Sequence, residues 1–161
     1  MRHAAVLVVA FVITGCPRGG GDTTPARVLT PKEVTSAARA TIEQWRQAYE
    51  VRSLDALGKL YAHNIDLVVV QEGLPLVGWS SVEGMLKDRL VRYKDVHVRL
   101  KDIQVQSLAP TAATATAAMT RELGDGVTTV TEYGALTIVL RKDGEQWLIV
   151  SEHYSFKRGG S

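Results

Sequence analysis

The feature that most limits the fold is a change of period in the second half of the chain. From Tyr93 onward apolar and polar residues alternate with a period of two, which is typical of half-buried β-strands. Turn residues at Gly124–Gly126 and Asp143–Gly144 divide this region. We expect one strand to begin near residue 93 and three more to cover about 111–123, 127–141 and 145–156.

The first of these strands changes parity in its middle. Val96 and Val98 fall on one parity, whereas Ile103 and Val105 fall on the other. Because a one-residue slip would turn every later side chain to the wrong face, we expect a β-bulge near Lys101–Asp102. Such a bulge also bends the strand.

A long helix is expected before the strands. Thr30, Pro31 and Glu33 form a helix start, with a capping threonine, a proline at the first position and a glutamate three residues after the cap. The apolar residues that follow at helical spacing lie on one face, and they are Ala38, Ile42, Trp45 and Tyr49.

Two shorter helices and a small hairpin complete this half. Ser53 can cap a short second helix, and Ser80 with Glu83 repeats the capping-box spacing and opens a third. Between them, "DLVVV" and "LPLVGW" are strand-like runs separated by a turn at Glu72–Gly73. Helices followed by an antiparallel meander predict an α+β fold and not a doubly wound parallel sheet. A bent sheet around a long helix makes a cone whose wide mouth can hold a ligand.

The segments "IEQWRQAYEVRSLDALGKLYAHNIDLV", "GLPLVG" and "DGEQWLIVSEHYS" resemble the NTF2-like (nuclear-transport-factor-2-like) superfamily. The nearest branches are the SnoaL-like domains and the association domain of calmodulin-dependent kinase. The resemblance covers residues 32 to 156. It implies a cone-shaped fold that commonly pairs through its open sheet face, in proteins that range from isomerases and cyclases to non-catalytic scaffolds. Its most specific part comprises Asp143, Gly144, Trp147, Val150, His153 and Ser155.

The N-terminus has the order of a secretory signal peptide, with Arg2 before an apolar run from Ala4 to Ile13 that is too short to span a membrane. The run ends in "ITGC", which resembles the lipobox of bacterial lipoproteins and implies lipidation of Cys16. The alternative is a plain cleaved signal with an accidental cysteine. By resemblance to enteric sorting, Pro17 favours the periplasmic side of the outer membrane. The expected divisions are a signal peptide (1–15), lipidated cysteine and flexible tether (16–30), domain (31–157) and tail (158–161).

Composition excludes several kinds of site. The formal net charge is +2 and there is no run of Lys or Arg, so the sequence has no basic segment that would indicate nucleic-acid binding. With one cysteine in the chain, an internal disulfide cannot form. The four histidines show no metal-ligand spacing, and there is neither a phosphate-binding glycine loop nor a nucleophile elbow. We therefore expect no metal and no cofactor.

The resemblance also allows a test for steroid-isomerase chemistry. In that branch the general base is an Asp soon after the second helix, and a helix-one Tyr donates to the forming enolate. An ungapped alignment places Val69 at the position of the Asp and Trp45 at that of the Tyr. Valine cannot exchange a proton. Asp66 and Glu72 lie three residues to either side, and a shifted alignment would bring one of them to this position.

Glu132 is the acid of most interest, because it interrupts the apolar face of the strand over 127–141. A buried carboxylate there needs a partner or a raised pKa, and His153 and His97 are candidate partners. The alternative is that Glu132 meets water at the strand's start. If the last strand is regular, Glu152 and Tyr154 point away from the face of His153. The candidate pocket residues are Trp45, Tyr49, Trp79, His97, Glu132 and His153.

Three functional hypotheses follow. The first is an exported, lipid-anchored domain that binds a small, partly apolar ligand or acts as a homodimeric interaction module, without assigned catalysis. The second is an isomerase, dehydratase or hydrolase that uses Glu132 and His153 as an acid–base pair. The third is an immunity or accessory protein of a secreted system.

Overall fold

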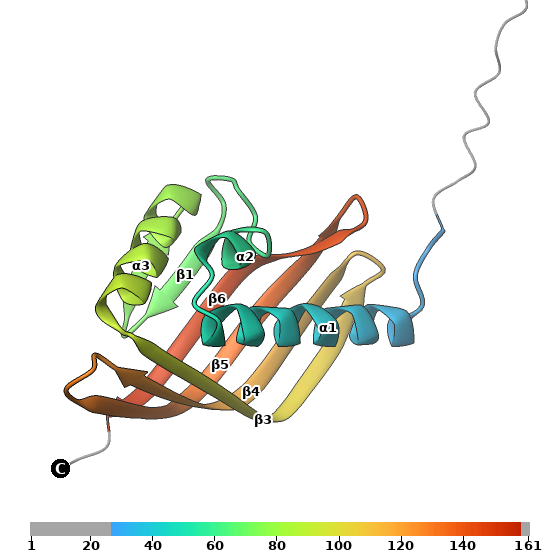
Figure 1. Cartoon of the computed structure of the whole chain (residues 1–161). Coiled ribbons are helices and arrows are strands. Elements are labelled where there is room, and N and C mark those ends of the chain that lie inside the picture. The colour runs from blue at the N-terminus through green and yellow to red at the C-terminus, as the bar shows by residue number, and fades with distance from the viewer. Residues whose placement is uncertain (1–26, 159–161) are drawn as a thin grey trace, which may run out of the picture.

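The computed structural model describes residues 27–158 (Figure 1). The expected signal peptide, Cys16, most of the tether and the last three residues lie outside the described part of the chain. Of the helices in residues 27–158, none combines the length and the apolar character that crossing a membrane requires.

Within the described residues, three helices are present: α1 (Pro31–Glu50), α2 (Leu54–Gly58) and α3 (Trp79–Arg92). The expected capping box is confirmed, since the Thr30 hydroxyl accepts from the Glu33 N–H and the Glu33 carboxylate accepts from the Thr30 N–H. Ser53 caps α2 by accepting from the Ala56 N–H at 3.1 Å. Both helix starts were therefore predictable from local hydrogen-bonding chemistry.

The expected start of α3 is wrong. The helix begins at Trp79 with Gly78 as its N-cap, and no side chain caps it. The Gly78 N–H donates to the Leu67 carbonyl at 2.8 Å, and the Trp79 N–H donates to the Asn64 carbonyl at 3.2 Å. Because these backbone bonds turn the chain into the helix two residues earlier than a cap at Ser80 would, Ser80 is already helical and cannot act as the cap.

Six strands form one sheet in residues 27–158, in the order β2-β1-β6-β5-β4-β3. All neighbouring strands are antiparallel except β1 and β6, which are parallel. Helix α1 crosses one face of this sheet and packs against β3 (Figure 1). The α+β class is confirmed, and the fold is NTF2-like. The strands are β1 (Val68–Gln71), β2 (Leu74–Val77), β3 (Asp95–Ala109), β4 (Ala112–Gly124), β5 (Thr129–Asp143) and β6 (Gln146–Arg158).

The bulge expected in β3 is confirmed. The register of β3 on β4 shifts between Lys101 and Gln104, and Asp102 has a φ of 53°. Beyond it the strand bends toward α1, where Arg39 Nη2 donates to the Ile103 carbonyl at 2.8 Å. The change of parity in the sequence therefore marks the position where the sheet curves around the helix.

A second bulge, in β6, was not expected. Val139 pairs with Ser151 and Leu140 pairs with Ile149, so that Val150 is an extra residue opposite β5. Ile149 is buried before the bulge, and Glu152 is buried after it, so the buried parity changes within the strand. The expectation of a regular last strand is therefore wrong.

Candidate functional site

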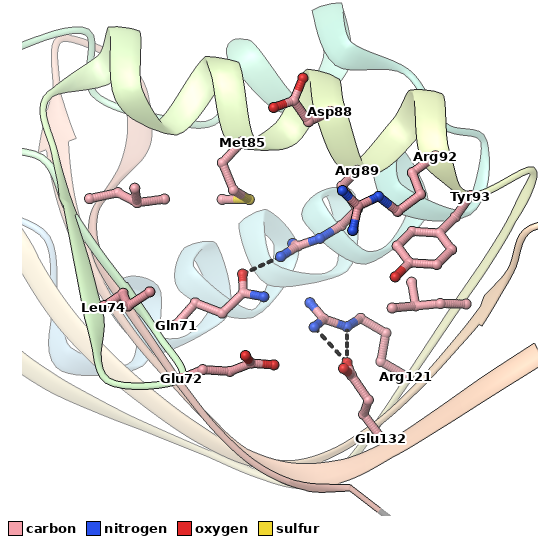
Figure 2. A pocket seen from close by; sticks show the side chains of 12 residues that line it. Gln71, Glu72, Leu74, Met85, Asp88, Arg89, Arg92, Tyr93, Arg121 and Glu132 are labelled. Carbon is pink, nitrogen blue, oxygen red and sulfur yellow. Dashed lines mark hydrogen bonds and ion pairs between the residues drawn. The ribbon is translucent and has the colours of Figure 1, made fainter.

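A cavity of about 390 Å³ lies between α3, the β1–β2 hairpin and the ends of β4 and β5. Figure 2 shows α3 along one side of it, with Arg89 reaching in from the helix and Arg121 from the sheet. The cavity mixes aliphatic, aromatic and charged side chains. Its lining residues are Gln71, Glu72, Leu74, Leu76, Met85, Asp88, Arg89, Arg92, Tyr93, Arg121, Leu123 and Glu132.

Glu132 is buried in the wall of this cavity and forms an ion pair with Arg121. Arg121 Nη2 and Nε lie 2.6 and 2.8 Å from Glu132 Oε2, and the two residues are only 2% and 5% exposed. The Arg121 guanidinium also lies 4.4 Å from the centre of the Phe156 ring. Glu132 therefore has a charged partner, as a buried carboxylate requires, but this partner is an arginine and not a histidine. The alternative in which Glu132 meets water is also wrong.

Arg89 is the second buried cation of the cavity, and it is 7% exposed. Its Nη1 donates to the Tyr49 hydroxyl at 3.1 Å, and its Nη2 donates to the side-chain carbonyl of Gln71 (Figure 2). Both of these partners are uncharged. Because a guanidinium stays protonated in proteins, Arg89 places a positive charge against the cavity.

A buried polar cluster lies in the core under α1. Glu152 is 0% exposed and accepts hydrogen bonds from the hydroxyls of Tyr61 at 2.9 Å and Tyr154 at 2.7 Å. The Tyr61 hydroxyl in turn accepts from Trp45 Nε1 at 2.9 Å. This cluster joins α1, the segment after α2, and β6 through groups that are all hydrogen-bonded.

Burial raises the pKa of Glu152 to about 7, although the hydroxyls of Tyr154 and Tyr61 and the charge of Arg89 act to lower it. Glu152 is the neighbour of Val69 across the β1–β6 pair. In the steroid-isomerase alignment the general base falls at Val69 of β1. Here the carboxyl group in this part of the core belongs to Glu152 of the neighbouring strand, β6. Glu152 is not among the lining residues of the cavity.

The expected pocket residues divide into four groups. Glu132 lines the cavity, whereas Trp45 and Tyr49 are each 1% exposed and belong to the core behind it. Trp79 is half-buried and stacks on His63 with ring centres 4.3 Å apart.

His97 and His153 are both exposed, so neither lines the cavity with Glu132. His97 alternates with the buried Val96 and Val98, and His153 alternates with the buried Glu152 and Tyr154. The proposed acid–base pair of Glu132 and His153 is therefore wrong, since the bulge at Val150 turns His153 to the outer face of the sheet.

Sequence reasoning missed Arg89, Arg121 and Glu152. A signal was present for the two arginines. Arg89 follows Val82 and Leu86 on the apolar face of α3, and Arg121 continues the buried parity of Met119 and Leu123 in β4. A charged residue at an apolar position was the same signal that drew attention to Glu132. For Glu152 there was none, because its orientation depends on the bulge.

Metal ligands do not cluster in this part of the chain. Among residues 27–158, no group of three or more His, Cys, Asp or Glu side chains could hold a metal ion. What the cavity offers to a ligand is guanidinium and carboxylate groups, an amide, a phenol and aliphatic side chains.

Comparisons with known proteins agree with this architecture. A family model described as "SnoaL-like domain" matches residues 38–158. No curated protein matches the sequence.

Three solved structures illustrate the likeness. A proposed dehydratase of the NTF2-like family from Streptomyces avermitilis is 20% identical, with a TM-score of 0.72 over 80% of this chain and 99% of that one. An NTF2-like protein of unknown function from Pseudomonas putida KT2440 is 23% identical, with a TM-score of 0.67 over 77% and 87% of the chains. A proposed association domain of calcium/calmodulin-dependent protein kinase type II from Thiobacillus denitrificans is 19% identical, with a TM-score of 0.64 over 74% and 94%.

Proposed function

The chain belongs to the SnoaL-like domain family, and from that premise we propose that it binds a small, partly apolar molecule in the cavity under α3. The observation that carries this proposal is the cavity itself. Its volume of about 390 Å³ falls within the range of ligand pockets, and both aliphatic side chains (Leu74, Leu76 and Leu123) and buried polar groups line it.

Binding is favoured over catalysis because the two buried acids of this region, Glu132 in the cavity wall and Glu152 behind it, are not placed for proton transfer to a ligand. Glu132 is held in an ion pair with Arg121, and Glu152 is enclosed by tyrosines in the core. A general base must be within reach of the proton that it removes. The similarity to a proposed dehydratase supports a shared fold and does not by itself support a shared reaction.

Export and lipid anchoring are part of the same proposal. The basic start, the short apolar run and the "ITGC" sequence support a signal peptide and a lipidated Cys16. Residues 16–30 would then tether the domain to the membrane, on the periplasmic side of the outer membrane. Residues 27–30, which precede α1, lead away from the rest of the domain (Figure 1).

Replacing Cys16 by serine is expected to release the protein from the membrane, because the sulfur that carries the lipid is lost. Fractionation of cells that produce the chain, with detection in the membrane and soluble fractions, measures this. The matched control is Ser36→Ala, an exposed change within the domain, which should leave the distribution unchanged. Equal membrane recovery of the Cys16→Ser chain would contradict lipid anchoring.

We also propose that the domain forms a homodimer through the outer face of the sheet. This face carries small exposed residues such as Thr116, Ala118 and Ala135, and Tyr133 is 55% exposed beside them. An exposed sheet face of this kind suits pairing with a second flat surface. A monomeric mass in light scattering would contradict the dimer.

Filling the cavity tests the binding function. We expect some members of a metabolite library to raise the Tm of the chain, by roughly 5–10 °C at concentrations near 100 times Kd. The same compounds should fail to stabilise Met85→Trp, because Met85 lines the cavity and a larger side chain occupies it.

The matched control is Val91→Trp on the same helix, since Val91 is 75% exposed and outside the cavity. It should retain the full thermal shift. Absence of any stabilising compound, or equal shifts in Met85→Trp and the unchanged chain, would contradict ligand binding at this position.

A further inference from the structure

The chemical class of the ligand can be inferred from the charges in the cavity wall, provided that the cavity is the ligand site proposed above. We propose that it takes a small monocarboxylate with an apolar tail, and that Arg89 holds the carboxylate.

The buried charges of the cavity do not balance. Arg89, Arg121 and Glu132 are the charged lining residues that are less exposed than one tenth. Arg121 and Glu132 compensate each other through the ion pair. Arg89 has hydrogen bonds to a phenol and an amide, which carry no charge. The buried wall of the cavity therefore has an excess of one positive charge.

The exposed charges at the edge of the cavity affect a bound ligand less. Glu72, Asp88 and Arg92 are all exposed to solvent. Interactions of charges in water are weakened by its high dielectric constant and by salt, whereas a buried guanidinium acts through a medium of lower dielectric constant. The buried excess around Arg89 therefore dominates the preference for a ligand's charge.

Glu152 does not remove this excess below pH 7. It interacts with Arg89, but burial raises its pKa to about 7, so it is mostly protonated below that pH. The groups around Glu152 are Trp45 and Tyr49 of α1, Tyr61, Tyr154 of β6 and Arg89 of α3. At pH 6 Arg89 is the charged member of this set, and its charge is left for a ligand to neutralise.

The shape and lining of the cavity define the rest of the ligand. A guanidinium offers parallel N–H donors, which match the two oxygens of a carboxylate. Leu74, Leu76 and Leu123, with Met85, line the same cavity as Arg89 and give an apolar tail surface to contact. A single uncompensated charge favours one carboxylate over two. A cavity of about 390 Å³ has room for a tail such as a short chain or a single ring.

The test compares acids with their neutral amides on the full chain. Benzoate and hexanoate are titrated by calorimetry beside benzamide and hexanamide, which have nearly the same shape but no charge. We expect each carboxylate to bind at least about tenfold more tightly than its amide, because a charge-assisted pair replaces a neutral hydrogen bond. Amides that bind as tightly as the acids would overturn the inference and leave the proposed binding function intact.

Variants then assign the preference to Arg89. Arg89→Gln should weaken benzoate binding about tenfold or more and bring it to the level of benzamide. Lys87→Gln removes the same charge from an exposed position on α3 outside the cavity, and should change benzoate binding by less than about twofold. An unchanged preference in a folded Arg89→Gln chain would overturn the role of Arg89.

Arg89→Lys keeps the positive charge but loses the parallel N–H donors of the guanidinium. It provides a second variant should Arg89→Gln not fold. We expect it to retain a preference for benzoate over benzamide that is smaller than that of the unchanged chain. If the library yields only neutral ligands, the inference fails while ligand binding stands. If neither acids, amides nor library compounds bind, the proposed function fails together with it.

Discussion

Replacing Gly134 by alanine is expected to destabilise the domain by about 4 kcal/mol or more, which is among the largest effects of a single substitution. A Cβ atom at Gly134 would lie 2.8 Å from the Ser155 carbonyl carbon and 2.9 Å from Phe156 Cα, and closer still to the Ser155 carbonyl oxygen. Carbon atoms in favourable contact are about 3.5–4.0 Å apart, so β5 and β6 would have to separate. Urea unfolding of the two chains measures the loss.

The pairing of Gly134 with Phe156 extends this effect to the cavity. The Phe156 ring lies against Arg121, which is paired with Glu132 in the cavity wall. We therefore expect Gly134→Ala to weaken ligand binding as well as folding.

The matched control is Gly84→Ala, since Gly84 is an exposed helical residue and a Cβ there would meet no atom within 4 Å. It should stabilise the protein by up to about 1 kcal/mol through helix propensity. Unfolding midpoints for Gly134→Ala that equal those of the unchanged chain would show that β5 and β6 do not approach as closely as described.

The second large effect is a dependence of stability on pH that originates at Glu152. Its pKa is raised from an ordinary value of 4.5 to about 7 in the folded protein. Between these values the unfolded chain has released its proton while the folded chain keeps it, so folding takes up a proton. The free energy of unfolding therefore falls as pH rises through this window, and the loss levels off above pH 7. The total contribution of Glu152 is on the order of 3 kcal/mol.

Glu152→Gln isolates this contribution, because an amide resembles the protonated carboxyl group and does not titrate. Urea unfolding between about pH 5 and 8.5 should show a smaller fall of stability with pH in this variant. It should be more stable than the unchanged chain at the upper end. Glu83→Gln, at an exposed position of α3, is the control and should follow the unchanged chain. Parallel pH curves for Glu152→Gln and the unchanged chain would contradict the raised pKa.

The parts of the fold that sequence reasoning predicted rest on signals between near neighbours. The capping box of Thr30 and Glu33 and the cap at Ser53 involve residues three apart in the chain, and both are present. The bulge at Lys101–Asp102 was visible because the apolar parity changes across it. Glu132 was singled out in the same way, as a charged residue within an apolar alternation, whereas its burial was left open by the sequence and decided by the structure. These features need no knowledge of the partner strand.

The candidate site was predicted less well, because it depends on partners that are distant in sequence. Arg121 and Glu132 meet across the β4–β5 pair, and Arg89 reaches Tyr49 and Gln71 from another helix. Histidine was the expected partner of Glu132, yet pairing across the sheet supplies an arginine instead. The capping-box pattern at Ser80 also failed, because backbone bonds from Gly78 and Trp79 to earlier residues start α3 sooner.

Which segments become helices and strands, and which of their positions are apolar, follows from the sequence, since period and capping are properties of neighbouring residues. Whether Glu152 or His153 faces the core depends instead on how the strands pair. Val150 is extra in the pairing of β6 with β5, and this one residue reverses the orientation of every side chain after it. The reversal arises from how two strands fit together in a curved sheet, so the alternation of residues within β6 alone cannot specify it.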